Sequence, residues 1–167
     1  KKYRVPTADY AAFESPSEAA AYIRGKGLPA VIKADGLAAG KGVMPVHSLA
    51  EAEKAIDTIL TRKEFGAAGS RIVIEDFLRG EEASFIAFTD GKTILPMPST
   101  QDHKAIYDGD KGPNTGGMGA YSPAPVITEK LARRIMDEVM TPVVKGMAAE
   151  GSPFKGILYA GMMIDGD

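Results

Sequence analysis

The segment "AVIKADGLAAGKGVMPV", residues 30–46, most constrains what this chain can fold into. Two short apolar runs, 30–33 and 43–46, flank a loop of glycine and alanine with a lysine at each side, Lys33 and Lys41. Short apolar runs bounded by glycine are typical of strands. The sequence therefore predicts a strand, a loop and a second strand. Such a loop either cradles phosphate through its backbone amides or is a plain flexible hairpin turn.

Two common nucleotide-binding loops do not fit this segment. A Walker A loop needs glycine where the chain has Asp35, and serine or threonine after Lys41, where it has Gly42. A dinucleotide fingerprint needs a helix directly after its glycines, but the pair Gly40 and Gly42 is followed by a run of strand type. The phosphate cradle and the plain hairpin remain as alternatives.

Two capping boxes predict where helices begin in the first half of the chain. They are "SPSE" at residues 15–18 and "SLAE" at residues 48–51. A strand is expected over residues 71–77. The second helix should bury an apolar stripe that consists of Ala52, Ala55, Ile56, Ile59 and Leu60.

The second half of the chain predicts two more strands, a long helix and a closing strand. The strands, 83–89 and 92–95, are joined at an Asp-Gly turn, the helix covers 128–149, and the last strand covers 156–164. The helix should be kinked at its proline. The residues expected on its buried face are Leu131, Ile135 and Val139.

Helices and antiparallel strands in this order predict an α+β fold with two lobes, residues 1–79 and residues 80–167. Residues 97–125 show no periodicity, and a loop of this length in a compact domain is usually functional or disordered. Its charged, amide and glycine residues suit anions and small polar ligands. The chain has no initiating methionine and stops just after an Asp-Gly turn signal, so we expect a piece of a longer protein.

Composition excludes several classes of function. The absence of cysteine excludes disulfides and thiolate chemistry, and two histidines are too few for a histidine metal site. A net charge of −2, with both signs spread evenly, argues against nucleic acid as a partner. No apolar run is long enough to cross a membrane and no signal peptide opens the chain, so the cytoplasm is the expected location.

Carboxylates around the end of the strand 71–77 form a candidate nucleoside clamp. Backbone groups of Phe77 and Leu78 could pair with an adenine edge, with Glu75 before them and Glu82 accepting bonds from ribose hydroxyls. The alternative is an acidic strand end that faces water, and the residues alone favour that alternative.

The two histidines have different expected roles. His103, in the sequence Asp102-His103-Lys104, is a general base, a phosphate contact or a solvated turn residue. His47 lies beside a helix cap and is expected to be structural. Asp108 and Asp110 are typical of turn chemistry rather than of a cation site.

Four segments together resemble the ATP-grasp region of the glycinamide ribonucleotide synthetase family, the phosphoribosylamine–glycine ligases. In chain order they are "VIKADGLAAGKGV", "IVIEDFLRGEEASF", "STQDHKAI" and "GPNTGGMGAYSPAP", and the last is the most specific. The resemblance implies an ATP-grasp fold, truncated at both ends, that holds ATP between two lobes. It also implies that glycine is phosphorylated and that 5-phosphoribosylamine attacks the glycyl phosphate, giving glycinamide ribonucleotide, ADP and phosphate.

The resemblance also implies site residues. Those expected to bind ATP are Lys33, Gly36, Gly40, Lys41, Gly42, Glu75, Phe77, Leu78 and Glu82. Those expected to face glycine and phosphoribosylamine are Asp102, Lys104, Asn114, Thr115, Gly116 and Gly117. The Mg²⁺ ligands are expected beyond Asp167, so these 167 residues should bind nucleotide weakly and lack turnover.

Two rival functions are kept open. One is another ATP-grasp carboxylate–amine ligase, which residues 112–125 would distinguish. The other is a nucleotide-binding module that has kept the fold without the chemistry.

Overall fold

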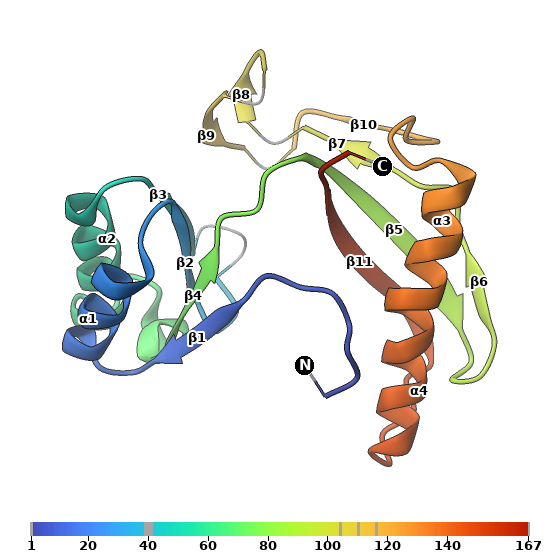
Figure 1. The fold of residues 1–167 in the computed structure, drawn as a ribbon, viewed down its shortest axis with the longest axis horizontal. Helices are drawn as coiled ribbons and strands as arrows, with labels where there is room; N and C mark the ends of the chain where they lie inside the picture. Colours follow the sequence, from blue (N-terminus) through green and yellow to red (C-terminus); the bar gives the residue numbers. More distant parts are fainter. Residues whose placement is uncertain (1, 39–41, 104, 110, 116, 167) are drawn as a thin grey trace. The chain divides into compact units, whose positions relative to one another are not determined.

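The computed structural model describes residues 2–38, 42–103, 105–109, 111–115 and 117–166, with the backbone alone at 113 and 114. The chain divides into two compact units (Figure 1). The first is Ala8–Leu78, and the second joins Lys1–Thr7 to Arg79–Asp167. The N-terminal residues thus group with the second unit, whereas the sequence placed them in the first lobe.

The first unit is a four-stranded antiparallel sheet with two main helices. Its strand order is β1-β4-β2-β3. Ser15 and Ser48 cap the two helices by accepting hydrogen bonds from Glu18 N–H and Glu51 N–H, which confirms both capping boxes. The elements are β1 (Tyr10–Phe13), α1 (Pro16–Lys26), β2 (Ala30–Ala34), β3 (Val43–Val46), α2 (Leu49–Ile56), the π-helical turn η1 (Asp57–Thr61), the 3-10 turn η2 (Gly66–Ser70) and β4 (Ile72–Asp76).

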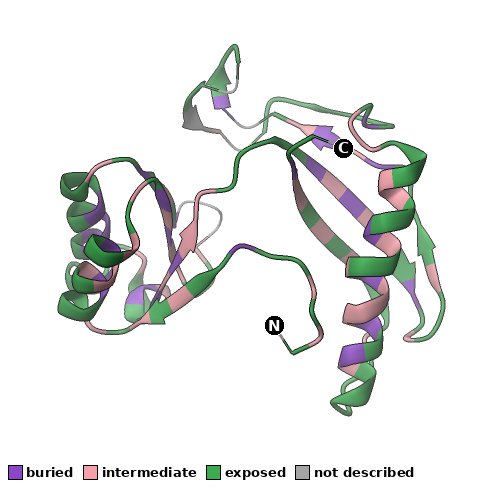
Figure 2. Cartoon of the chain, viewed as in Figure 1, coloured by how far each residue is buried: buried purple, intermediate pink, exposed green. Residues whose placement is uncertain are grey.

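The core of the first unit lies between this sheet and its helices. Burial alternates along β2 and β4, so Ile32 and Ile74 face the core while Val31 and Lys33 lie on the other face. Figure 2 shows the alternation along the strands and the buried side of α2. The stripe predicted on the second helix is confirmed, since all five of its residues are at most 6% exposed, namely Ala52, Ala55, Ile56, Ile59 and Leu60.

The second unit has a three-stranded antiparallel sheet, in the order β11-β5-β6, with one long helical segment packed on it. The predicted turn at Asp90 is confirmed, because its carboxylate accepts the N–H groups of Lys92 and Thr93. The elements are β5 (Glu81–Thr89), β6 (Ile94–Pro96), β7 (Gln101–Asp102), β8 (Ala105–Tyr107), β9 (Lys111–Asn114), β10 (Ala120–Tyr121), α3 (Glu129–Ile135), the π-helical turn η3 (Met136–Met140), α4 (Thr141–Ala149) and β11 (Gly156–Ile164).

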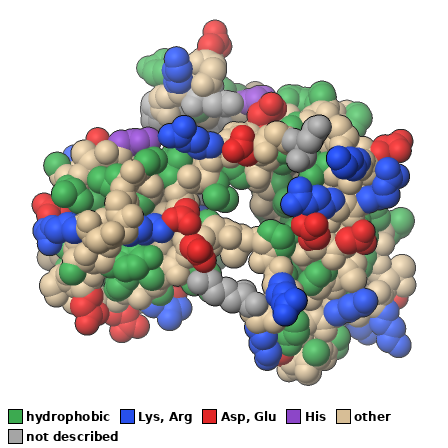
Figure 3. Space-filling model, viewed as in Figure 1, with side chains coloured by type: hydrophobic (Ala, Val, Ile, Leu, Met, Phe, Trp, Pro, Cys, Tyr) green, Lys and Arg blue, Asp and Glu red, His purple; other side chains and the backbone are tan. Residues whose placement is uncertain are grey.

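The long helical segment is continuous from α3 to α4, but it widens into the π turn η3 just before Pro142. This turn changes which side chains are buried: Met140 is fully buried and Val139 only partly. Leu131 and Val139 are both partly buried against the core around Ile135, so the predicted face is confirmed, but the burial of Met140 was missed. Charged side chains of both signs cover the outer side of α3 (Figure 3). Among the described residues, no helix is both long and apolar enough to cross a membrane.

Residues 97–125 are more structured than the sequence suggested. They contain β7, paired with β10, and the hairpin of β8 with β9. The prediction of one long loop was wrong because these strands are only two to four residues long. A period of two residues cannot be recognised in so short a run.

Candidate functional site

Lys33 and Glu75 meet on the face of the first sheet opposite its helices. Lys33 lies on β2 and Glu75 on the neighbouring β4, where Glu75 is opposite Val31. The side chains are therefore diagonal neighbours, and Lys33 Nζ lies 2.6 Å from Glu75 Oε2. They are 37% and 23% exposed, so this face presents a cation whose direction is set by a carboxylate.

The loop between β2 and β3 is closed at its neck by a hydrogen bond. The Ala34 N–H donates to the Gly42 carbonyl at 2.9 Å, which continues the pairing of the two strands. Gly42 is buried, and a Cβ there would lie 2.8 Å from Ala38 Cβ and 3.0 Å from Ala34 Cβ. A side chain at position 42 has no room between these two alanines, so the close packing of the neck requires glycine there. Gly40 and Lys41 lie outside the described residues.

The start of this loop is held against the end of η2. The Asp35 N–H donates to the Arg71 carbonyl at 3.0 Å, and the Asp35 carboxylate pairs with Nε and Nη2 of Arg71. Gly36 follows, and a Cβ there would lie 2.6 Å from Ala68 Cα. The next side chain, Leu37, is fully exposed. The loop thus leaves the sheet along a path that η2 defines.

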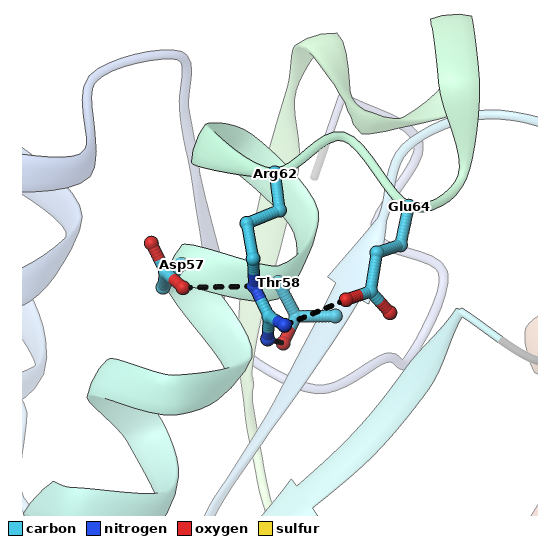
Figure 4. Close-up of polar contacts among 4 residues, drawn as sticks. All are labelled: Asp57, Thr58, Arg62 and Glu64. Carbon is cyan, nitrogen blue, oxygen red and sulfur yellow. Dashed lines mark hydrogen bonds and ion pairs between the residues drawn. The ribbon is translucent and has the colours of Figure 1, made fainter.

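The segment before η2 is held in turn by Arg62 (Figure 4). Its Nε lies 2.9 Å from Asp57 Oδ2, its Nη1 lies 2.8 Å from Glu64 Oε1, and its Nη2 donates to Thr58 Oγ1 at 2.5 Å. One guanidinium therefore connects the π turn η1 with the connection that leads into η2. The two ion pairs are half-exposed, so they fix the position of this segment but contribute little to the free energy of unfolding.

The residues after β4 place an aromatic and an apolar side chain in succession. The Phe77 ring lies edge-on to the His47 ring with their centroids 5.4 Å apart, and Leu78 is 47% exposed. The His47 N–H donates to Glu51 at 2.7 Å, and this bond is the chief reason that the pKa of Glu51 is lowered. The structural role of His47 remains a prediction, and its ring contact with Phe77 was missed.

Glu82, the predicted ribose contact, belongs to the second unit. It lies on β5 opposite Met163 of β11 and is exposed. Its role remains a prediction.

The substrate-facing residues come together in part. Asp102 pairs with Ala120 across β7 and β10, and a Cβ at Gly117 would lie 3.8 Å from Asp102 Oδ2. The Gly117 N–H donates to Thr115 Oγ1 at 3.1 Å. Lys104 and Gly116 lie outside the described residues. Asn114 ends β9 opposite Ala105.

Two residues in this region were missed from the sequence. Gln101 is 3% exposed, and its Oε1 accepts a hydrogen bond of 2.6 Å from the Tyr121 hydroxyl. His103 Nε2 lies 3.5 Å from the same hydroxyl oxygen. Gln101 and Tyr121 are direct cross-strand partners, twenty residues apart, so no local pattern could have joined them.

Comparison with known proteins decides the family. Residues 1–167 match the phosphoribosylglycinamide synthetase, ATP-grasp (A) domain. The chain belongs to this family. Phosphoribosylamine–glycine ligase from Vibrio vulnificus is 59% identical to it over 99% of the chain, which spans 39% of that relative.

Solved structures agree with the phosphoribosylglycinamide synthetase family and its ATP-grasp fold. The phosphoribosylamine–glycine ligase from Thermotoga maritima superposes with a TM-score of 0.85 at 35% identity, covering 97% of this chain and 41% of that one. The ADP complex of N5-carboxyaminoimidazole ribonucleotide synthetase has a TM-score of 0.67 at 21% identity, covering 97% of this chain and 38% of that one. The resemblance found in the sequence, and the α+β ATP-grasp fold that it implied, are confirmed.

Among the described residues of this synthetase domain, the chemistry of Lys33 suits a phosphate group. Lys33 offers a partly exposed ammonium with three donors, and Leu78, which follows the end of β4, offers an exposed apolar side chain. Within the described ranges, no three acidic or histidine side chains cluster as a metal site. The location of the Mg²⁺ ligands beyond Asp167 remains a prediction.

Proposed function

We propose that this chain is the ATP-binding part of a phosphoribosylamine–glycine ligase. The observation that carries the proposal is the 59% identity to such a ligase along 99% of the chain. The Lys33–Glu75 pair on the open face of the sheet supports it from the geometry. The proposed substrates are glycine and 5-phosphoribosylamine, with Mg²⁺ as the metal and the cytoplasm as the location.

ATP supplies the phosphoryl group that activates the glycine carboxylate. In the proposed site Lys33 neutralises phosphate charge, and Glu75 keeps the Lys33 ammonium directed along the sheet. Phe77 and Leu78 contact the adenine, with Glu82 as the proposed ribose contact. Reactions through acyl phosphates need alignment and charge neutralisation more than covalent help from the protein. This explains a site of lysine and backbone groups without a nucleophile.

The loop from β2 to β3 has a positioning role in this proposal. Its entry is held by Asp35 on Arg71 and its neck by the bond from Ala34 to Gly42. A preset path lowers the entropy lost when the loop binds phosphate. Gly36 and Gly42 serve this path by allowing close packing.

The proposal is tested in the complete protein that carries this sequence, by following ADP formation with glycine and 5-phosphoribosylamine. ADP formation should require both substrates. Lys33→Ala should raise the KM for ATP at least tenfold, because one charge-assisted contact contributes roughly 1.5–3 kcal/mol. Lys54→Ala, an exposed lysine on α2, is the matched control and should leave the KM unchanged.

Two results would contradict the proposal. One is ADP formation that is indifferent to glycine or to the amine, which would favour a different ligase of the same fold. The other is an equal KM for ATP in the Lys33 and Lys54 variants.

A further inference from the structure

A charged pair lies just beyond the β2–β4 ladder, where the loop from β2 to β3 begins. Ala34 of β2 is opposite Ile72 of β4, and the next residues outward are Asp35 and Arg71. The Asp35 N–H donates to the Arg71 carbonyl at 3.0 Å, so the ladder continues for one pair beyond the strands. Direct partners in an antiparallel ladder share a face of the sheet. The side chains of Asp35 and Arg71 therefore lie on one face.

The same face carries the Lys33–Glu75 pair. Side chains two residues apart along a strand lie on one face, so Asp35 follows Lys33 on the face opposite the helices. Lys33 Nζ lies 2.6 Å from Glu75 Oε2, and Nε and Nη2 of Arg71 both contact Asp35 Oδ2. Each of these two cations is thus matched to one carboxylate, and the signs of the charges alternate along the face.

The beginning of the loop is held from both sides. On the β4 side, Asp35 is held twice by Arg71, through its backbone N–H and through its carboxylate. On the β3 side, the Ala34 N–H donates to the Gly42 carbonyl at 2.9 Å. The Asp35 and Arg71 side chains are 31% and 54% exposed, and an ion pair this exposed contributes little to the free energy of unfolding. The pair therefore acts on the direction of the loop more than on stability.

The turn η2 supports the same two residues. Arg71 directly follows η2, and Ala68 lies within it. Gly36, the residue after Asp35, passes so close to this turn that a Cβ there would lie 2.6 Å from Ala68 Cα. The guanidinium and the packing of Gly36 thus fix the start of the loop against one short turn.

We propose that Arg71 is a positioning residue for ATP, which acts through Asp35. The inference rests on the proposed function, because it takes Lys33 and the loop as phosphate contacts. Arg71 holds the start of the loop, so less conformational entropy is lost when the loop binds the nucleotide. Its charge also balances the Asp35 carboxylate, which would otherwise lower the positive potential at Lys33. Both effects favour the binding of ATP.

The experiment compares the two KM values in the complete protein that carries this sequence. Arg71→Met keeps the aliphatic stem and removes the guanidinium. It should raise the KM for ATP about three- to tenfold and leave the KM for glycine unchanged. Arg71→Lys keeps the positive charge and should give a KM for ATP between those of the wild type and Arg71→Met.

Arg24→Met is the matched control. Arg24 Nη2 lies 2.5 Å from Glu53 Oε1 in the same unit, and the two side chains are 55% and 52% exposed. Loss of this pair should lower the melting temperature by about as little as Arg71→Met does and leave the KM for ATP unchanged. A similar small loss of stability with a different effect on ATP would separate a positioning role from a structural one.

A double-variant cycle tests whether Arg71 acts through Asp35. Asp35→Asn removes the ion pair without leaving an unbalanced carboxylate beside Lys33, so it should raise the KM for ATP less than Arg71→Met does. Once the carboxylate is gone, the guanidinium has no partner to hold. The KM of the double variant should therefore match that of Asp35→Asn within about twofold.

Three outcomes would overturn the inference. They are a wild-type KM for ATP in Arg71→Met, an equal rise of the KM for ATP and for glycine, and a double variant whose effect is the product of the two single effects. The proposed function is judged separately by Lys33→Ala. An impaired Lys33→Ala beside an unaffected Arg71→Met would remove the inference alone, whereas a wild-type KM in Lys33→Ala would count against the proposed function.

Discussion

At Gly36 the backbone passes so close to η2 that a side chain has no room. A Cβ there would lie 2.6 Å from Ala68 Cα, and a backbone atom cannot move as a side-chain tip can. We expect Gly36→Ala to lower the free energy of unfolding by about 1–3 kcal/mol. Gly25→Ala is the matched control, because nothing lies within 4 Å of its Cβ and alanine favours helix α1. Gly25→Ala should raise the free energy of unfolding by about 0.5–1 kcal/mol. Denaturant unfolding measures both, and equal effects would contradict the packing argument.

The ion pair of Lys26 with Asp76 links stability to pH. The pKa of Asp76 is lowered from its ordinary 3.8, chiefly because its carboxylate accepts a hydrogen bond from Lys26. A lowered folded-state pKa means that this stabilisation is fully present above about pH 4 and is lost as the pH falls through the folded-state value. The pKa of Lys26 is raised from 10.5 by the same bond, so the stability that comes from the charged Lys26 is lost only above that pH.

Asp76→Asn should therefore lower the melting temperature at neutral pH. It should also make the melting temperature depend less on pH below about pH 4. Melting temperatures at a series of pH values measure this. Asp137→Asn, an exposed aspartate on η3, is the control and should follow the wild-type curve. An Asp76→Asn curve parallel to the wild type down to low pH would show that the pair contributes nothing.

At the scale of elements, the π turn η3 determines how the long helical segment packs. The Thr141 N–H donates to the carbonyl of Met136, five residues back, and this wider turn places Met140 in the core after Ile135. It comes directly before Pro142, whose missing N–H cannot support a regular helical bond. A single wide turn thus lets a proline sit inside a continuous helix.

Met140→Ala should cost about 2–5 kcal/mol of stability, because the side chain is fully buried among Phe85, Ala87 and Ile135. Val139→Ala removes a partly buried side chain from the neighbouring position and should cost about 1 kcal/mol or less. A regular α-helix would give the opposite order, since Val139 then shares the face of Ile135. Denaturant titration of the two variants distinguishes these geometries.

At the scale of the whole molecule, the two units have separate cores. One centres on residues such as Ile32, Ile59 and Ile74, and the other on Phe85 and Met140. Local opening of a protein follows such cooperative units. The chain is therefore expected to lose structure one unit at a time.

Ile59→Ala should speed amide hydrogen exchange in β2 and β4 and leave β5 and β11 close to wild type. The reason is that a fully buried isoleucine of the first core is lost, at about 2–5 kcal/mol. Phe85→Ala is the reciprocal variant and should act on β5 and β11. Exchange measured by mass spectrometry tests both, and faster exchange in both units from either variant would mean that the chain unfolds as one.

Much of the local structure could be predicted because it depends on neighbours in the sequence. Ser15 and Ser48 cap helices through groups three residues away, and the α2 stripe follows from its period. The candidate site was only partly accessible in this way. Lys33 and Glu75 were each selected, but their contact depends on the register of β2 with β4.

The sequence by itself determined the family, the two caps, the strand–loop–strand at residues 30–46 and the residue types that a phosphate site needs. Only the tertiary structure decided why Gly36 and Gly42 are glycines, which residue of the π turn is buried, and that Tyr121 donates a hydrogen bond to Gln101. The physical reason is the range of the interactions. Caps and periodicity act over a few residues, whereas close approach and cross-strand hydrogen bonds join segments that the sequence keeps far apart.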